Sequence, residues 1–82
     1  MNYYVYLIVS KIKKKTISYV GYTNNLKKRI KKHNSNKGAK FTKGKKWKLV
    51  YYEIYDSKIE AMKKEYSLKK NYNLRNKLKR LS

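Results

Sequence analysis

The chain has 82 residues, no cysteine and a formal charge of +20, because 24 lysines and arginines face only four acids. This length fits one domain over residues 1–82, and the missing cysteine excludes disulfides, thiolate zinc sites and a cysteine nucleophile. The scarcity of acids argues against a two-metal nuclease, which needs several converging carboxylates, and the single histidine excludes metal sites built from several histidines.

Two apolar runs near the start of the chain predict a β-hairpin. Tyr3–Val9 is β-branched and aromatic on both alternating faces, which is typical of a central strand covered on both sides. Ile17–Tyr22 follows a short basic connection and predicts a second, antiparallel strand. If the pairing is symmetric about Ile12–Lys13, Tyr6 lies opposite Tyr19 and within its reach.

The next segment predicts a helix and then a long loop. Thr23–Asn25 supply N-cap side chains for a helix that runs to about Asn34. The stripe of this helix that we expect to face the core holds Leu26, Ile30 and His33. Arg29 lies at the edge of that stripe. The Gly-, Ser-, Asn- and Lys-rich segment 34–46 is long enough to be a functional loop.

The remaining residues predict a third strand and two helices. Trp47–Tyr55 closes a small antiparallel sheet, and Ser57 with Glu60 matches the capping box of the next helix. On that helix Glu65 lies between two apolar stripes, where we expect it to be shielded from solvent. A last helix, Leu74–Leu81, presents its three leucines to the core. The expected fold is α+β, a small three-stranded antiparallel sheet flanked by helices in the order β-β-α-β-α-α.

The charge predicts a polyanionic partner. Self-repulsion of +20 charges is relieved when a polyanion neutralises them and releases its condensed counterions. We expect nucleic acid, with DNA first and RNA second. An anionic membrane is disfavoured, because no segment has the large apolar helix face that membrane adhesion needs. With no signal-peptide pattern and no apolar run near the roughly 20 residues that span a bilayer, we expect a soluble cytoplasmic protein, associated with the nucleoid if the source is bacterial.

Five side chains could hydrolyse a phosphodiester. Such chemistry needs a group that orients or deprotonates water, and cations that stabilise developing charge. Tyr6 and Tyr19 could stand side by side, and the positive field is expected to lower a tyrosine pKa toward useful values. Arg29 offers a planar fork for phosphate oxygens, and His33, one helical turn on, can move a proton near neutral pH. Glu65 is the best-placed carboxylate for one divalent ion.

Each of these residues also has a plainer explanation. Tyr6 is one of ten tyrosines and Arg29 one of 24 cations, so packing or solvation can account for either. His33 can be a core-edge histidine with satisfied hydrogen bonds. Glu65 and Lys69 make an ordinary i, i+4 helix pair worth roughly 0.3–0.5 kcal/mol. Residue spacing by itself leaves the choice open.

Several short motifs follow one another along the chain: Tyr4-Val5-Tyr6, Tyr19-Val20-Gly21, Asn25–Arg29 with His33, Gly38–Thr42, Leu49–Glu53 and Ala61–Glu65. In this order and spacing they resemble the GIY-YIG nuclease superfamily, in particular its small single-domain members. The resemblance covers nearly the whole chain, from about Asn2 to Leu81. One departure is Tyr4, which stands where the first motif of the family has a glycine.

The resemblance implies a divalent-metal-dependent endonuclease with one metal ion. At the matching positions it implies a tyrosine as general base or water-positioner, for which we expect Tyr6 with Tyr19 in support. It also implies Arg29 on the scissile phosphate with His33 beside it, and Glu65 as the ligand of Mg²⁺ or Mn²⁺. Nucleic acid, with DNA first, is the implied substrate, and DNA repair is the implied process.

The surface that would hold the substrate is expected to consist of lysines. We predict nucleic-acid contacts for Lys27, Lys28, Lys32, Lys40, Lys43 and Lys69. Larger relatives carry extra domains that choose the substrate, so here specificity comes from this surface or from a protein partner that supplies targeting. The alternative is a non-catalytic basic nucleic-acid-binding module that retains the GIY-YIG fold, which the charge and the missing targeting domain favour. A secreted basic peptide is disfavoured by the missing signal sequence and cysteines.

Overall fold

The predicted element order is confirmed. The computed structural model describes residues 1–81. Its elements are β1 (Tyr3–Ile12), β2 (Lys15–Thr23), α1 (Leu26–Asn34), a 3-10 turn η1 (Lys40–Thr42), β3 (Lys48–Tyr55), α2 (Lys58–Lys70) and α3 (Tyr72–Leu81). The strands form one antiparallel sheet in the order β2-β1-β3. Within residues 1–81, no helix combines the length and apolarity needed to cross a membrane.

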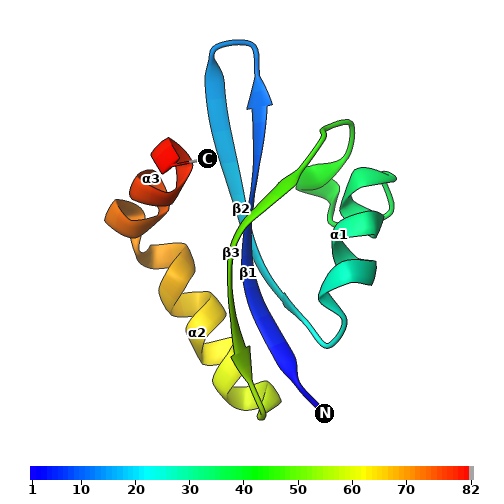
Figure 1. Cartoon of the computed structure of the whole chain (residues 1–82), viewed down its shortest axis with the longest axis vertical. Coiled ribbons are helices and arrows are strands. Elements are labelled where there is room, and N and C mark those ends of the chain that lie inside the picture. Colours follow the sequence, from blue (N-terminus) through cyan, green and yellow to red (C-terminus); the bar gives the residue numbers. More distant parts are fainter. Residues whose placement is uncertain (82) are drawn as a thin grey trace.

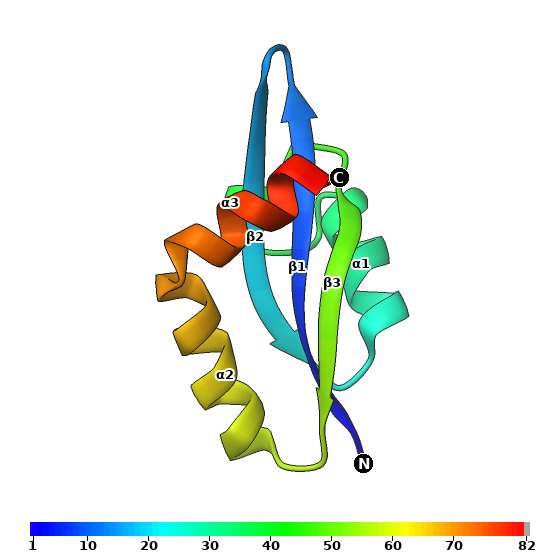
Figure 2. The same cartoon turned by 60° about the vertical axis from the view of Figure 1, so that its left-hand side comes forward.

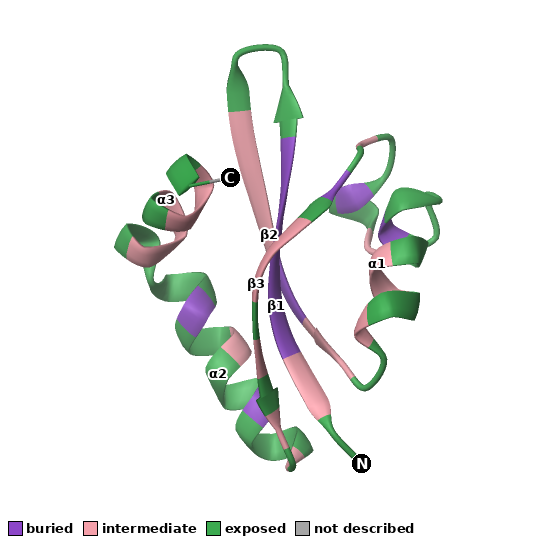
Figure 3. Cartoon of the chain, viewed as in Figure 1, coloured by how far each residue is buried: buried purple, intermediate pink, exposed green. Residues whose placement is uncertain are grey.

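The central position of β1 follows from its lack of a polar face. Figure 1 shows α1 on one side of the sheet and α2 with α3 on the other, and Figure 2 shows the same layers after a turn. Alternate residues of β1 therefore enter two separate cores, one containing Leu7 and the other Tyr6. Figure 3 shows the resulting continuous buried stretch along β1. A strand covered on both faces needs apolar side chains at successive positions, which is the pattern from which β1 was predicted.

The register of the hairpin differs from the prediction. β1 and β2 pair Tyr6 with Gly21, two residues from Tyr19. The strands continue to a tight turn at Lys13–Lys14, where Lys13 takes a left-handed φ of 56°. The predicted pairing of Tyr6 with Tyr19 was wrong because the lysine-rich sequence of this turn carries no glycine or asparagine to mark its centre. Since the shift is an even number of residues, both tyrosines still project from the same face of the sheet.

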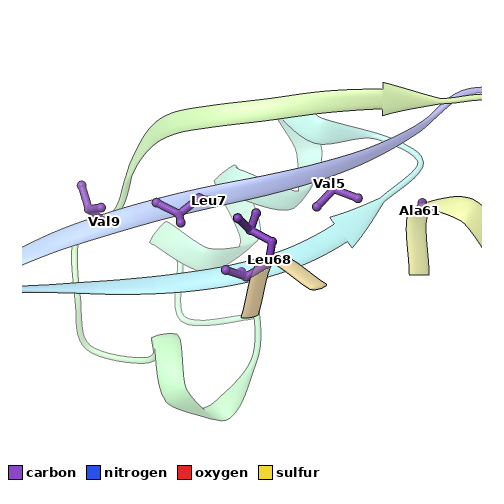
Figure 4. Packing of buried hydrophobic residues seen from close by; sticks show 6 residues of the cluster. Val5, Leu7, Val9, Ala61 and Leu68 are labelled. Carbon is purple, nitrogen blue, oxygen red and sulfur yellow. The ribbon is translucent and has the colours of Figure 1, made fainter. Parts of the chain in front are cut away.

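The core on the α2 side fixes that helix against the sheet. Figure 4 shows Val5, Leu7 and Val9 spaced along β1, with Leu68 beside the strand and Ala61 at one end of the cluster. All five are buried, and fully burying an aliphatic side chain of this kind contributes about 1.5–3 kcal/mol. This packing sets the position of α2 and hence of the acids that it carries.

α2 begins as predicted, and α3 ends at Leu81 as predicted but begins at Tyr72, two residues before the predicted Leu74. Ser57 caps α2 by accepting a hydrogen bond from the Glu60 backbone N–H at 3.4 Å. Leu74 and Leu78 of α3 pack against the core. Leu81 lies on the same stripe but is 74% exposed, so the prediction that it packs is wrong. The final turn of α3 extends past the cluster of buried residues.

Candidate active site

Four of the predicted site residues gather on the α1 face of the sheet. Tyr6 comes from β1, Tyr19 from β2, and Arg29 and His33 lie one helical turn apart on α1. The Asn25 side chain caps α1 by accepting from the Lys28 N–H at 3.1 Å, as the N-cap pattern predicted. The apolar residues packed around the cluster are Ile8, Ile17, Leu26, Ile30, Trp47 and Leu49.

Tyr6 is completely buried, and its ring lies directly over Gly21. The exposed fraction of Tyr6 is 0%. A Cβ atom on Gly21 would lie 2.5 Å from the Tyr6 hydroxyl oxygen and 2.7 Å from Cζ, distances that no side chain tolerates. This strand glycine is thus explained by the close approach of the phenol. Without it, the Tyr6 hydroxyl could not reach α1.

The hydroxyl of Tyr6 begins a chain of hydrogen bonds whose direction is determined. The Thr42 hydroxyl donates to the Ala39 carbonyl at 2.7 Å, so its oxygen must accept from His33 Nδ1 at 2.9 Å. Nδ1 of the neutral imidazole therefore carries the proton, and Nε2 is the acceptor. The Tyr6 O–H accordingly donates to His33 Nε2 at 2.7 Å. His33 is held at both ring nitrogens and is 0% exposed.

Arg29 connects this buried chain to the surface. Its Nε donates to the Tyr6 hydroxyl oxygen at 3.4 Å, and the side chain is half-buried. It opens into a polar pocket of about 180 Å³ at the start of α1, lined by Thr23, Asn24, Asn25, Lys28, Arg29 and Lys32. We call this the Arg29 pocket. Its cations and amides suit an anionic group such as phosphate.

Burial, rather than the positive field of the protein, is the main cause of the pKa shifts of Tyr6 and His33. Burial first, and the charge of Arg29 second, lower the pKa of His33 from 6.5 to about 4. Burial raises the pKa of Tyr6 to about 12, although the hydrogen bond and charge of Arg29 oppose this. The predictions that His33 titrates near neutral pH and that a tyrosine pKa is lowered are therefore wrong for this pair, because desolvation penalises each charged form.

Tyr19 is the motif tyrosine that reaches the surface. Its ring is half-buried and packs edge-to-face on His33, with 5.2 Å between centroids. The charge of an ionised Tyr19 is one of the causes that raise the pKa of Tyr6, so the two phenols are electrostatic neighbours. Tyr19 is thus the less buried of the two tyrosines.

Unlike the other four predicted site residues, Glu65 comes from α2, the helix on the side of the sheet opposite α1 (Figure 1). Its side chain is 20% exposed, as the position between two stripes predicted. Its negative charge raises the pKa of Tyr6, while Lys69 Nζ approaches Oε1 at 3.5 Å. No set of three or more histidines and acids that could bind a metal occurs among residues 1–81. A lone carboxylate fits an ion such as Mg²⁺, which takes one or two carboxylates and keeps water and phosphate oxygens as its other ligands.

The predicted lysines are spread over more than one surface. Lys28 and Lys32 line the Arg29 pocket, and Lys40 and Lys43 are exposed at η1. Lys27 instead borders a groove between α1 and β3. A larger basic cleft of about 620 Å³ lies elsewhere, lined by Lys11, Thr16, Asn76, Lys79 and Arg80. Since none of the candidate catalytic residues lines that cleft, it is separate from the site.

Two residues that hold the site were missed in the sequence. Thr42 is fully buried and sets the orientation of His33. Gly38 lies against the same imidazole, and a Cβ atom there would collide with His33 Nδ1. Both belong to the loop segment Gly38–Thr42, whose motif was visible but gave these residues no role. A threonine in a polar loop has no pattern that distinguishes it from a solvated one.

The chain is similar to known proteins over almost its whole length. A family model described as the GIY-YIG catalytic domain matches residues 2–79. A UPF0213 protein of Clostridium perfringens is 51% identical over 71 residues, which cover 85% of this chain and 72% of the relative. One from Staphylococcus saprophyticus is 42% identical over 82 residues, 99% of this chain and 95% of the relative. The solution NMR structure of the UPF0213 protein BH0048 from Bacillus halodurans aligns with a TM-score of 0.53 and 42% identity, covering 100% of this chain and 86% of that chain.

Proposed function

This chain belongs to the GIY-YIG family, and on that premise we propose that it is a divalent-metal-dependent endonuclease that hydrolyses phosphodiester bonds in nucleic acid, with DNA as the first candidate. The observation that carries the proposal is the contact of Arg29 with the buried Tyr6–His33 pair beside a polar pocket. A cation fixed in this way is preorganised for a phosphate, and preorganised charge is the largest single contribution in many enzymes.

Arg29 is the residue that we assign to the scissile phosphate. Its Nε is already engaged with Tyr6, so its terminal nitrogens are the donors for phosphate oxygens. Guanidinium donors match the planar, bidentate geometry of a phosphate. Tyr6 and His33 then act as positioning residues, because their hydrogen bonds fix the guanidinium from below.

Tyr19 is the residue that we assign to the attacking water. The burial of Tyr6 argues against the expectation that its hydroxyl meets water, whereas Tyr19 is half-buried. In this proposal the Tyr19 hydroxyl orients the water and, as the water oxygen bonds to phosphorus, takes a proton from it while releasing its own proton to solvent. The phosphodiester bond on the opposite side breaks, and the leaving oxygen takes a proton from solvent.

Glu65 is the residue that we assign to the metal ion, either Mg²⁺ or Mn²⁺. Its shielded side chain and its effect on Tyr6 support a role at this site rather than in bulk solvent. When bound, such an ion would supply positive charge that stabilises the phosphate and the leaving oxygen. Lys69, now paired with Glu65, would then be available to contact substrate.

The test is cleavage of branched, nicked and plain DNA with Mg²⁺ or Mn²⁺. We expect wild-type protein to cut, Tyr19→Phe to lose about 10²–10⁴-fold in rate, and Glu65→Gln to lose metal-dependent cleavage. Matched controls are Tyr72→Phe and Glu60→Gln, which change an exposed tyrosine of α3 and an exposed acid of α2 and should leave the rate unchanged. Equal cleavage by all variants would reject the proposal.

A non-catalytic nucleic-acid-binding module is the second candidate, and the net charge of +20 favours it. In that case the protein binds DNA but no substrate is cut with either metal, and Glu65→Gln leaves affinity as it was. Binding without cleavage under every condition would therefore select this alternative.

A further inference from the structure

The loop between α1 and β3 (Figure 1) is held in one conformation by side-chain hydrogen bonds. The Asn34 amide donates to the Trp47 carbonyl at 3.0 Å, and the Trp47 backbone N–H donates back to the Asn34 side chain. The Trp47 indole N–H donates to the Thr42 carbonyl at 3.0 Å. Thr42 is buried against His33. The residue between Lys40 and Thr42 is therefore displayed from a fixed backbone.

That residue is Phe41, whose side chain is 51% exposed. Its ring is stacked on that of Tyr19 with 6.1 Å between centroids and 20° between planes. It also contacts Trp47, with 6.2 Å between centroids. Half of a large apolar ring thus faces water in a protein of charge +20. Trp47 and His33 are buried although half of the Phe41 ring is exposed, so that exposed half is not needed to cover the core.

The surroundings of the Phe41 ring point to an anionic and aromatic ligand. Lys45 Nζ lies over the ring, 5.1 Å from its centroid, where its long side chain would move aside for a base. Lys40 and Lys43, before and after Phe41 in the sequence, are exposed. Through Tyr19 the ring adjoins His33 and so the Tyr6–Arg29 contact. A nucleotide combines the two chemistries that meet here, a flat base and a negative phosphate.

We propose that Phe41 is a stacking platform for an unpaired nucleobase next to the phosphate held at Arg29, and so the residue by which this chain favours a substrate with an unpaired nucleotide at that place. This rests on the proposed function. Inside a continuous duplex both faces of every base are covered by neighbouring bases, whereas an unpaired base can leave the stack and lie on an aromatic ring. The exposed half of Phe41 would thus distinguish the two kinds of substrate.

The experiment measures binding in EDTA, where no cleavage occurs. The probes are a fully paired duplex and the same duplex with a single-stranded flap that carries 2-aminopurine at the junction. We expect Phe41→Leu to weaken flap binding by about 10- to 100-fold, to leave duplex binding unchanged, and to abolish the change in 2-aminopurine fluorescence that binding of the wild type causes. Phe41→Tyr keeps an aromatic face and should behave as the wild type.

Phe41→Leu is the decisive variant, because leucine still fills the apolar contact with Tyr19 and Trp47 but offers no aromatic face. Its melting temperature is compared with that of the wild type to verify that it folds. Unchanged flap binding, or an equal loss for flap and duplex, would overturn the proposal. Binding in EDTA does not require cleavage, so the binding result holds even if the nuclease assay detects no cleavage. If the protein cleaves DNA but Phe41→Leu binds the flap as tightly as the wild type, the platform is rejected and the proposed nuclease function stands.

Discussion

His33 and Tyr6 are residues whose surroundings decide their chemistry. A lone histidine on a basic helix would be expected to titrate near its ordinary pKa of 6.5. Here complete burial and the nearby guanidinium keep the imidazole neutral. The neutral ring accepts a hydrogen bond from the Tyr6 hydroxyl at Nε2. The pair therefore serves as a fixed support for Arg29 rather than as a site of proton exchange in the resting protein.

Thr42→Val tests the orientation of the His33 ring. Valine has nearly the same shape but leaves Nδ1–H of His33 buried without an acceptor, which costs about 1–3 kcal/mol of unfolding free energy. Thr42→Ser keeps the oxygen and should lose less, although it lacks the methyl group. Urea denaturation measures both. A valine variant as stable as the wild type would mean that the bond from His33 to Thr42 contributes nothing.

The lowered pKa of His33 predicts how stability depends on pH. Between pH 6.5 and about 4 the unfolded histidine binds a proton that the folded one does not, so unfolding becomes easier as pH falls. The loss across this window is on the order of 3 kcal/mol. His33→Gln should remove this component of the pH dependence, whatever its baseline stability. Parallel stability curves for wild type and His33→Gln, recorded by urea denaturation at several pH values, would contradict the prediction.

At the scale of elements, the hairpin register brings the site together. Pairing of Tyr6 with Gly21 lets a phenol on the central strand cross over the edge strand and meet α1. The loop from α1 to β3 then completes the site from the other side, through Thr42 and Gly38. The site is thus formed by residues of β1, β2, α1 and the loop that follows α1 together.

Gly21→Ala should disrupt this crossing. The new methyl group would lie 2.5 Å from the Tyr6 hydroxyl oxygen, so the buried ring must shift and its bond to His33 must lengthen. We expect a loss of about 1–3 kcal/mol in unfolding free energy, together with reduced activity. Ser18→Ala, on the same strand, is the control and should cost far less. If Gly21→Ala and Ser18→Ala have the same melting temperature, the Tyr6 ring has room to move.

For the whole molecule, charge is the dominant property. Twenty-four cations on a small core raise the electrostatic cost of folding and the affinity for polyanions together. Where those cations lie still matters, because the Arg29 pocket concentrates Lys28 and Lys32 beside the candidate site. The lysines of the hairpin turn, Lys13 and Lys14, lie at the far end of two strands.

Salt dependence distinguishes a local contact surface from a uniform cationic coat. About six phosphate contacts predict a slope near −5 for log affinity against log salt. Replacing Lys28 and Lys32 by Gln should make the slope shallower by about 2, whereas the same change at Lys13 and Lys14 should leave it unaltered. Fluorescence anisotropy over a salt series measures both. Equal effects of the two pairs would indicate that the whole surface binds.

Much of the architecture was predictable because it follows from local patterns. The doubly apolar Tyr3–Val9 run required a central strand, and the caps at Asn25 and Ser57 marked where helices begin. Positions such as Arg29 and Glu65 could be nominated as candidates from motif order. Leu81 and the hairpin turn were mispredicted, because periodicity does not reveal where a core ends or where a lysine-rich turn is centred.

The sequence by itself determined the order of the elements, the net charge from which a polyanionic partner is predicted, and the family to which the chain belongs. The tertiary structure alone decided that Tyr6 is buried beneath Arg29, that Tyr19 is less buried than Tyr6 and that Thr42 orients His33. The physical reason is that apolar periodicity and charge are properties of neighbouring residues, whereas desolvation and hydrogen-bond direction depend on which distant side chains meet.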